Sequence, residues 1–138
     1  MLNDAARALI ASGALAHCAT VNADGTPQLS VMWVGLDGDE LVSAHMGAWQ
    51  KVKNLQRNPQ AVLSFQGDGR LPNGMQHTMV VHASARVTTG GAAQLLYDLG
   101  KIYVGPDAEF RMSDDPDAGY VVHYRVDKVG GFGPWTEG

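Results

Sequence analysis

Residues 41–65, LVSAHMGAWQKVKNLQRNPQAVLSF, place the tightest constraint on what this chain can fold into. Both ends of the stretch are apolar runs that favour buried strands, and the middle has the spacing of a short helix. Val52 and Leu55 lie three residues apart, so both face one side of that helix. Asn58-Pro59 ends it, because proline disfavours a helical residue before it. The stretch predicts a basic helix held against a β-sheet.

The predicted helix carries three cations, and their spacing leaves two interpretations open. Lys53 and Arg57 lie four residues apart and share a solvent-facing stripe, whereas Lys51 lies about 200° around the helix from Lys53. Both lysines reach one ligand only if Lys51 lies in the first turn or a partner chain contributes. The segment is either a solvated charged face or an anion site at the start of the helix. The net charge of −4 makes a concentrated basic patch notable and favours the anion site.

Turn signals divide the rest of the chain into short strands. Asp24-Gly25 between apolar runs predicts a hairpin, and Asp37-Gly38 predicts a second tight turn. The resulting elements are strands at residues 15–21, 28–36, 41–46, 61–65, 77–87 and 120–126, helices at 3–11 and 91–103, a turn-rich loop at 66–76, an irregular segment at 105–117, and a glycine-rich tail at 129–135 without regular structure.

This order of elements predicts an α+β fold that is mainly β. We expect a closed six-stranded antiparallel barrel with a few flanking helices, because closure removes the exposed edges of such strands. With 138 residues, 45% of them hydrophobic, the chain fits a single domain over residues 1–138.

Composition and motifs exclude several classes of function. The acidic balance argues against a nucleic-acid binder, and no apolar run approaches the ~20 residues that span a membrane. Cys18 stands alone, which fits a reducing, cytoplasmic compartment without a disulfide framework. The five histidines lack the short spacing of a metal site, so no metal is predicted. No Gly-x-Ser-x-Gly elbow is present, and the glycine-rich tail lacks the Lys-Ser/Thr of a P-loop.

Four segments in a fixed order carry a family resemblance. They are ATVNADGTPQ at residues 19–28, Trp33-Val34, KVKNL at residues 51–55, and Asn58-Pro59. This set resembles the pyridoxamine 5'-phosphate oxidase-like, FMN-binding split-barrel superfamily, and within it the branch that uses the deazaflavin coenzyme F420. The match runs from about residue 17 to 87, with 120–135 in looser register. The resemblance implies a split barrel, a homodimer and a flavin-like cofactor in a groove between the protomers.

The resemblance also implies which residues hold that cofactor. The second strand lines the ring, the end of the third strand contacts the cofactor, the basic helix grips its phosphate, and a C-terminal aromatic closes the site from the other subunit. In that order the residues are Ser30, Val31, Met32 and Trp33; Ser43, Ala44 and His45; Lys51 with Lys53 and Asn54 adjacent; and Trp135. The chain departs from the pattern at Gln50, where relatives commonly carry Arg or Lys, and at His82 and Ala85, where they usually carry an acidic residue and a glycine.

From this resemblance we expect an oxidoreductase in which reduced F420 delivers hydride to a small conjugated substrate. The cofactor carries the reactive chemistry, and the protein supplies binding, orientation and exclusion of water. FMN in the same groove, as in pyridoxamine phosphate oxidation or flavin reduction, is the second hypothesis. A protein that binds the cofactor or haem without turnover is the third. No catalytic residue is assigned, since Tyr97, Tyr103, His45 and solvent are all candidate proton donors.

Overall fold

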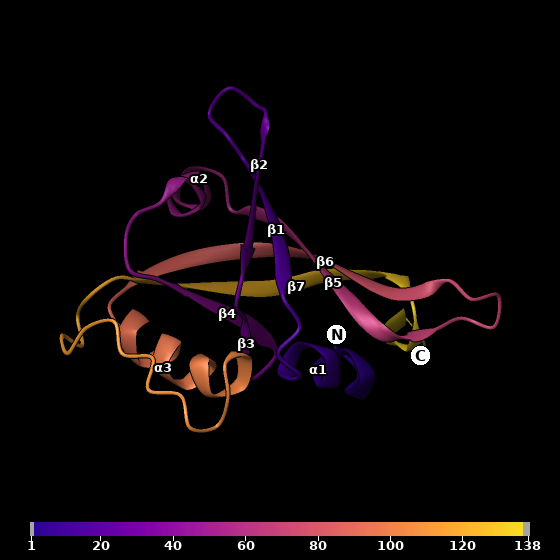
Figure 1. Ribbon diagram of the computed structural model, residues 1–138. Coiled ribbons are helices and arrows are strands. Elements are labelled where there is room, and N and C mark those ends of the chain that lie inside the picture. Colours follow the sequence, from indigo (N-terminus) through magenta and orange to yellow (C-terminus); the bar gives the residue numbers. More distant parts are fainter. Residues whose placement is uncertain (1, 137–138) are drawn as a thin grey trace.

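The computed structural model describes residues 2–136. Figure 1 shows a curled sheet with helices against it. In chain order the elements are α1 (Asp4–Ala11), β1 (Ala16–Val21), β2 (Pro27–Met32), β3 (Gly35–Asp37), β4 (Glu40–His45), α2 (Gln50–Arg57), β5 (Gln60–Arg70), β6 (Gln76–Thr89), α3 (Ala92–Tyr103), β7 (Tyr120–Phe132) and the 3-10 helix η1 (Pro134–Thr136). No helix in this part of the chain has the length and apolar character needed to cross a membrane.

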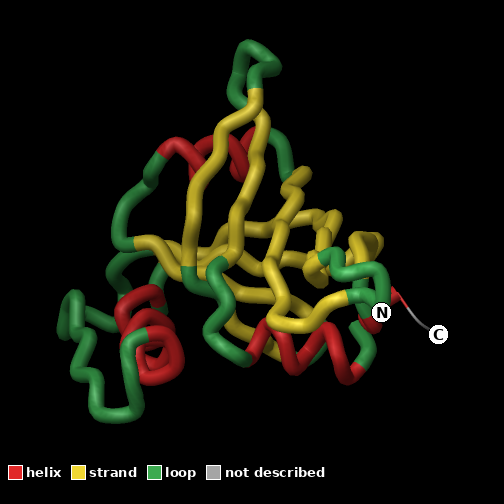
Figure 2. The backbone as a smooth tube through the Cα atoms, turned by 45° about the vertical axis from the view of Figure 1, so that its right-hand side comes forward, coloured by secondary structure: helices red, strands yellow, loops and turns green. Residues whose placement is uncertain are grey.

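The strands form one seven-stranded sheet in the order β2-β1-β5-β6-β7-β4-β3. Every neighbouring pair is antiparallel. The long strands β6 and β7 lie near the middle and pair from Thr78 opposite Phe132 to Thr89 opposite Tyr120. The β1–β2 hairpin projects beyond the rest of the sheet (Figures 1 and 2). The α+β, mainly β class predicted from the sequence is therefore confirmed.

The prediction of a closed six-stranded barrel is wrong. The sheet has seven strands, and no ladder joins the edge strands β2 and β3 within residues 2–136. Only Trp33 and Val34 separate these two strands in the chain, so the sheet curls until its edges are near neighbours. The continuous strand expected at 28–36 breaks there because the Tyr103 hydroxyl accepts a hydrogen bond from Val34 N at 3.1 Å. The same hydroxyl donates to Ala14 O at 2.8 Å, which connects the gap to the segment between α1 and β1.

The glycine-rich tail is also more regular than predicted. β7 continues to Phe132 and stays paired with β6, so the expectation of no regular structure over residues 129–135 is wrong. Gly131 has a φ of +96°, and a Cβ there would lie 2.2 Å from Thr78 O. Glycine thus permits the close approach of the two strands. The loop predicted at 66–76 shortens to a turn, because β5 extends to Arg70 and β6 begins at Gln76.

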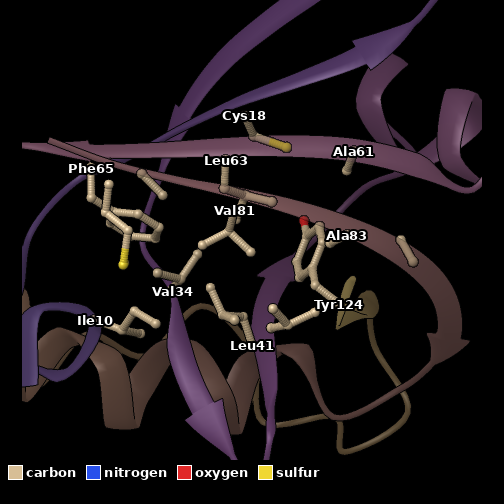
Figure 3. Packing of buried hydrophobic residues seen from close by; sticks show 14 of the residues in the cluster. Ile10, Cys18, Val34, Leu41, Ala61, Leu63, Phe65, Val81, Ala83 and Tyr124 are labelled. Carbon is tan, nitrogen blue, oxygen red and sulfur yellow. The ribbon is translucent and has the colours of Figure 1, made fainter. Parts of the chain in front are cut away.

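The hydrophobic core lies inside the curl of the sheet (Figure 3). Alternate residues of β5 point inward, and they meet side chains from β6, β7 and α1. The fully buried large apolar residues include Ile10, Val34, Leu41, Leu63, Phe65, Val81 and Tyr124. Helix α1 begins at the cap residue Asn3, whose side chain accepts from Ala6 N at 2.9 Å. Asn3 Nδ2 also donates to Pro134 O at 2.9 Å, so the two ends of the described chain lie together.

Candidate functional site

An apolar pocket of about 330 Å³ opens between β2, β4, α3 and the loop that follows α3. Its lining residues are Val31, Met32, Trp33, Ala44, His45, Met46, Trp49, Leu96, Phe110 and Met112. Five of the predicted cofactor-contacting residues, from the second strand and from the end of the third predicted strand, are therefore brought together. The other walls come from the segment before α2, from α3 and from the irregular loop, and sequence reasoning missed them. The sequence signal that could have indicated the loop's contribution was the presence of the apolar residues Phe110 and Met112 within an acidic segment.

Two aromatic side chains hold Trp33 in place as a wall of the pocket. Its ring stacks on Tyr103 with centroids 5.3 Å apart, and Phe110 packs against it at 5.1 Å. A Cβ at Gly100 would lie 2.8 Å from Phe110 Cβ, so this glycine of α3 gives Phe110 its place. The Tyr103 hydroxyl is already occupied at the gap between β2 and β3. Tyr103 therefore packs against Trp33 and holds it in place without lining the pocket itself.

Lys51 lies in the first turn of α2 and is buried, with 6% of its surface exposed. Its Nζ donates to Ser30 Oγ at 3.1 Å and to Met32 Sδ at 3.4 Å. No carboxylate in residues 2–136 forms an ion pair with it. Burial lowers the pKa of the Lys51 ammonium. An ammonium in this position is costly to bury, because its partners are neutral.

The other polar residues of α2 do not share this position. Lys53 is exposed on another side of the helix, as its spacing predicted, so the two lysines do not converge. Asn54 is fully buried, and its Nδ2 donates to Thr20 Oγ1 at 3.0 Å and to Asn22 Oδ1 at 2.9 Å. Gln50 Nε2 in turn donates to Asn54 Oδ1 at 2.8 Å. Asn54 therefore anchors α2 to the β1–β2 hairpin. Gln50, which stands where relatives commonly carry a cation, hydrogen-bonds Asn54 and so supports this anchor.

His45 stands at the boundary between the pocket and a buried polar chain. Its Nε2 lies 2.7 Å from Ser43 Oγ, which lies 2.8 Å from the hydroxyl of the buried Tyr124. Burial, and after it the charge of Lys51, lowers the pKa of His45 to about 3. The imidazole is therefore neutral at pH 7. Among the candidate proton donors, His45 alone lines the pocket, since Tyr97 donates to Glu109 Oε2 at 3.0 Å on the surface.

Trp135 lies away from the pocket. It is 6% exposed, its Nε1 donates to Thr78 O at 2.9 Å, and its ring meets His77 edge-on at 5.5 Å. Within its own chain Trp135 belongs to the core. Its predicted contact with a site in the other subunit stays a prediction.

Comparison with known proteins identifies relatives of this arrangement. A family model described as pyridoxamine 5'-phosphate oxidase matches residues 2–123. No curated protein matches the sequence. A solved structure described as an F420 reductase has 25% identity over 90% of this chain and 94% of its own, with a TM-score of 0.72.

Two further solved structures share the fold. HupZ from Group A Streptococcus has 19% identity over 95% of this chain and 94% of its own, with a TM-score of 0.64. A heme-binding protein from Mycobacterium smegmatis has 20% identity over 95% of this chain and 53% of its own, with a TM-score of 0.65. At these identities the likeness concerns the fold alone.

Proposed function

Because the chain belongs to the pyridoxamine 5'-phosphate oxidase family, we propose that it is an oxidoreductase that binds the deazaflavin coenzyme F420. It transfers hydride between this cofactor and a small conjugated substrate. The likeness to an F420 reductase, at 25% identity over nearly the whole length of both chains, supports F420 over other cofactors. The description of the matched family supports FMN as the alternative.

The observation that carries the proposal is the buried ammonium of Lys51 beside an apolar pocket. Lys51 Nζ contacts Met32 Sδ at 3.4 Å, and Met32 also lines the pocket. A buried cation with only neutral partners favours an anionic ligand, which would supply the missing opposite charge. Val31, Trp33 and Trp49 offer apolar and aromatic surface to a planar ring. An anionic molecule with a planar ring fits both features.

In this proposal the roles of the protein are binding, orientation and exclusion of water. The cofactor supplies the hydride chemistry when it is bound. Lys51 holds the negative charge of the cofactor, while Val31 and Trp33 hold its ring. His45 offers a neutral polar group in the pocket wall, so it does not act as a cationic acid at neutral pH. Ala44 lines the pocket, whereas Ser43 is fully buried behind His45, and the contacts of Ser30 and Ser43 with the ligand stay predictions.

The proposed assembly is a homodimer that covers the mouth of the pocket. Leu29 and Val31 of the edge strand β2 are 66% and 54% exposed, and Trp49 is 62% exposed. A second copy packed on this surface would bury these side chains and shield the cofactor from water. Size-exclusion chromatography with light scattering measures the expected dimer, and a monomer at micromolar concentration would contradict it.

The direct test is to titrate the purified protein separately with F420 and with FMN and to follow absorbance and fluorescence. We expect F420 to bind at micromolar concentration and FMN more weakly. Binding of FMN alone would move the proposal to FMN chemistry, and binding of neither cofactor would overturn it. Tight binding without reduction of quinone or enone acceptors by the reduced cofactor would contradict an enzyme and favour a carrier.

A pair of charge reversals tests the role of Lys51. Lys51→Glu should weaken binding of an anionic cofactor by more than about 1 kcal/mol, because a charge-assisted contact is lost. Lys53→Glu makes the same change of charge at the exposed lysine of the same helix, so it should cost much less. Equal effects of the two variants would show a general influence of net charge and would contradict a specific contact.

A further inference from the structure

His45 joins the pocket on one side of its ring and a buried hydroxyl chain on the other. Its Nε2 contacts Ser43 Oγ, whereas its Nδ1 has no hydrogen-bond partner in residues 2–136. Within that range, His123 Nδ1 is the side-chain atom that is both shut off from solvent and unpartnered. His45 Nδ1 is therefore open to solvent, although the residue as a whole is 6% exposed. Since His45 lines the pocket, its partly open nitrogen is inferred to face the pocket.

The direction of the hydrogen bonds follows from what the Tyr124 hydroxyl can reach. Ser43 Oγ lies 2.8 Å from this hydroxyl, and Met32 Sδ lies 3.8 Å away. The Cys18 sulfur is a further contact, and sulfur is a weak acceptor in both residues. Tyr124 therefore donates to Ser43. The reverse direction would leave a buried hydroxyl proton with weak acceptors only, at the cost of desolvation.

Once Tyr124 donates to Ser43, the serine hydroxyl has one remaining side-chain acceptor, His45 Nε2. Ser43 Oγ is hydrogen-bonded through its side chain to Tyr124 and to His45 Nε2. Since it accepts from Tyr124, it donates to Nε2, which must carry the lone pair. A neutral imidazole with a lone pair on Nε2 carries its proton on Nδ1.

We propose that Ser43 and Tyr124 are positioning residues that hold His45 as the Nδ1–H tautomer, so that it donates a hydrogen bond into the pocket. The matching ligand is a planar ring with an acceptor atom, a carbonyl oxygen or an unprotonated ring nitrogen, at its edge. That the ligand is a redox cofactor rests on the proposed function, whereas the tautomer follows from this chain alone. The sequence missed Tyr124 because it lies 81 positions from Ser43.

The nearby charges keep this donor neutral. Burial and the Lys51 ammonium both disfavour an imidazolium at His45. The thiol of Cys18 is neutral as well, because burial raises its pKa to about 11. Tyr124 is completely buried, and burial raises its pKa too. A neutral N–H in such surroundings stabilises a partial negative charge on an acceptor without transferring a proton to it.

Nuclear magnetic resonance of the ¹⁵N-labelled histidines in the cofactor-free protein tests the tautomer directly. A protonated and an unprotonated imidazole nitrogen resonate far apart, and the spectrum of His45→Gln identifies the His45 signals. We expect a protonated Nδ1 and an unprotonated Nε2, unchanged between pH 5 and pH 8. A protonated Nε2, or formation of the imidazolium in that pH range, would overturn the inference.

Two variants test whether the hydroxyl chain sets the tautomer. Tyr124→Phe removes the donor to Ser43, and Ser43→Ala removes the donor to Nε2. Either change should shift His45 toward the Nε2–H tautomer. Tyr103→Phe is the matched control, because it removes a tyrosine hydroxyl that bonds Val34 and Ala14 instead. It should leave the His45 signals in place even if it lowers stability.

The outcomes separate this inference from the proposed function. If Tyr124→Phe and Ser43→Ala both leave the tautomer unchanged, the positioning role is wrong while cofactor binding stands. If neither F420 nor FMN binds, the proposed function is wrong while the measured tautomer still decides the inference. Should either variant fail to fold, the wild-type spectrum alone still confirms or overturns the Nδ1–H assignment.

Discussion

A tryptophan lies at each of two opposite regions of the molecule, but only one of the two is buried by the rest of its own chain. We call the region around the buried Trp135 the completed end and the region around Trp49 the pocket end. Near the C-terminus, Trp135 is 6% exposed and its indole N–H is satisfied by Thr78 O. Around the pocket, Trp49 is 62% exposed and Val31 of β2 is 54% exposed. Figure 1 places α2 and the yellow segment that follows β7 on opposite sides of the molecule. A tryptophan is thus part of the core near η1, whereas a tryptophan and a valine are exposed around the pocket.

Polar groups repeat this contrast. Beside the pocket, Lys51 has neutral partners only and His45 Nδ1 has none in the described chain. Near the C-terminus, the indole N–H of Trp135 and the amide of Gln76, which donates to Gly67 O at 2.8 Å, are both satisfied within the chain. Polar groups that are costly to bury without strong partners, when they gather in one place, indicate a functional site more strongly than exposed apolar residues alone. The contrast separates the region that the chain completes with its own side chains from the region where we propose that a ligand binds.

The largest expected effect is at the completed end. Trp135→Ala should lower the free energy of unfolding by about 3–5 kcal/mol, because it empties a buried aromatic site and leaves Thr78 O without its donor. Urea denaturation followed by circular dichroism measures the loss. A decrease below about 1 kcal/mol would contradict the view that this end is structural. Cofactor affinity of the folded variant tests the separate prediction that Trp135 contacts a site in the partner subunit, because a fall supports that contact and an unchanged affinity contradicts it.

Acid should act through His45 at the pocket end. Its pKa is about 3 when folded and near 6.5 when unfolded, so the unfolded chain binds the proton more readily. The corresponding stability is complete above pH 6.5 and is lost as the pH falls toward 3, by about 3 kcal/mol at pH 4. Denaturation of wild type and His45→Gln across this range measures the difference. His82→Gln, at an exposed histidine of β6, is the control, and equal pH dependence in wild type and His45→Gln would contradict the prediction.

Lys51→Met should separate stability from binding. Removal of a buried cation without a carboxylate should raise the free energy of unfolding by about 1–2 kcal/mol, while binding of an anionic cofactor weakens. Lys53→Met, at the exposed lysine, should change neither quantity noticeably. Thermal denaturation and a cofactor titration on the same samples measure both. A less stable Lys51→Met protein would show that the Ser30 and Met32 contacts of the ammonium outweigh its burial cost.

The smallest effect on stability is expected for Trp49→Ala. Because the side chain is 62% exposed, its loss should change the free energy of unfolding by no more than about 0.5 kcal/mol. The affinity for a ring-containing cofactor should nevertheless fall, since Trp49 forms a wall of the pocket. The expected effect on stability is the opposite of that of Trp135→Ala, because Trp135 is buried and Trp49 is not. Unchanged cofactor affinity would remove Trp49 from the site.

Local patterns predicted the elements that depend on neighbouring residues. The short helix with Val52 and Leu55 buried is confirmed as α2, and Lys51 lies in its first turn. The Asp24-Gly25 hairpin is confirmed as well, with Gly25 at a φ of +88° and Asp24 Oδ1 accepting from Thr26 N at 3.0 Å. Such features are visible in the sequence because the interactions that form them span a few residues.

Features that depend on distant residues were out of reach. The break between β2 and β3 requires the Tyr103 hydroxyl, which lies 69 positions from Val34. The barrel prediction failed at the same place, because no pattern within β2 or β3 shows that Tyr103 replaces a strand partner. The resemblance predicted the contributions of β2 and β4 to the pocket, and it predicted Lys51 together with the spacing of the basic helix; their role in binding stays a prediction. Phe110 was missed because its packing on Trp33 depends on Gly100 in α3.

The hydrogen bond from Asn3 to Pro134 O has a consequence for engineering. A short peptide linker between these neighbourhoods would make the chain a ring with little change to the sheet. The ring could be reopened at residues 22–26, where the β1–β2 hairpin turns at the surface. Such a circular permutant would keep every strand pairing and the wall of the pocket while it moves both termini to the hairpin tip. The order of strands in the sheet therefore depends less on where the chain begins and ends than on which strands pair.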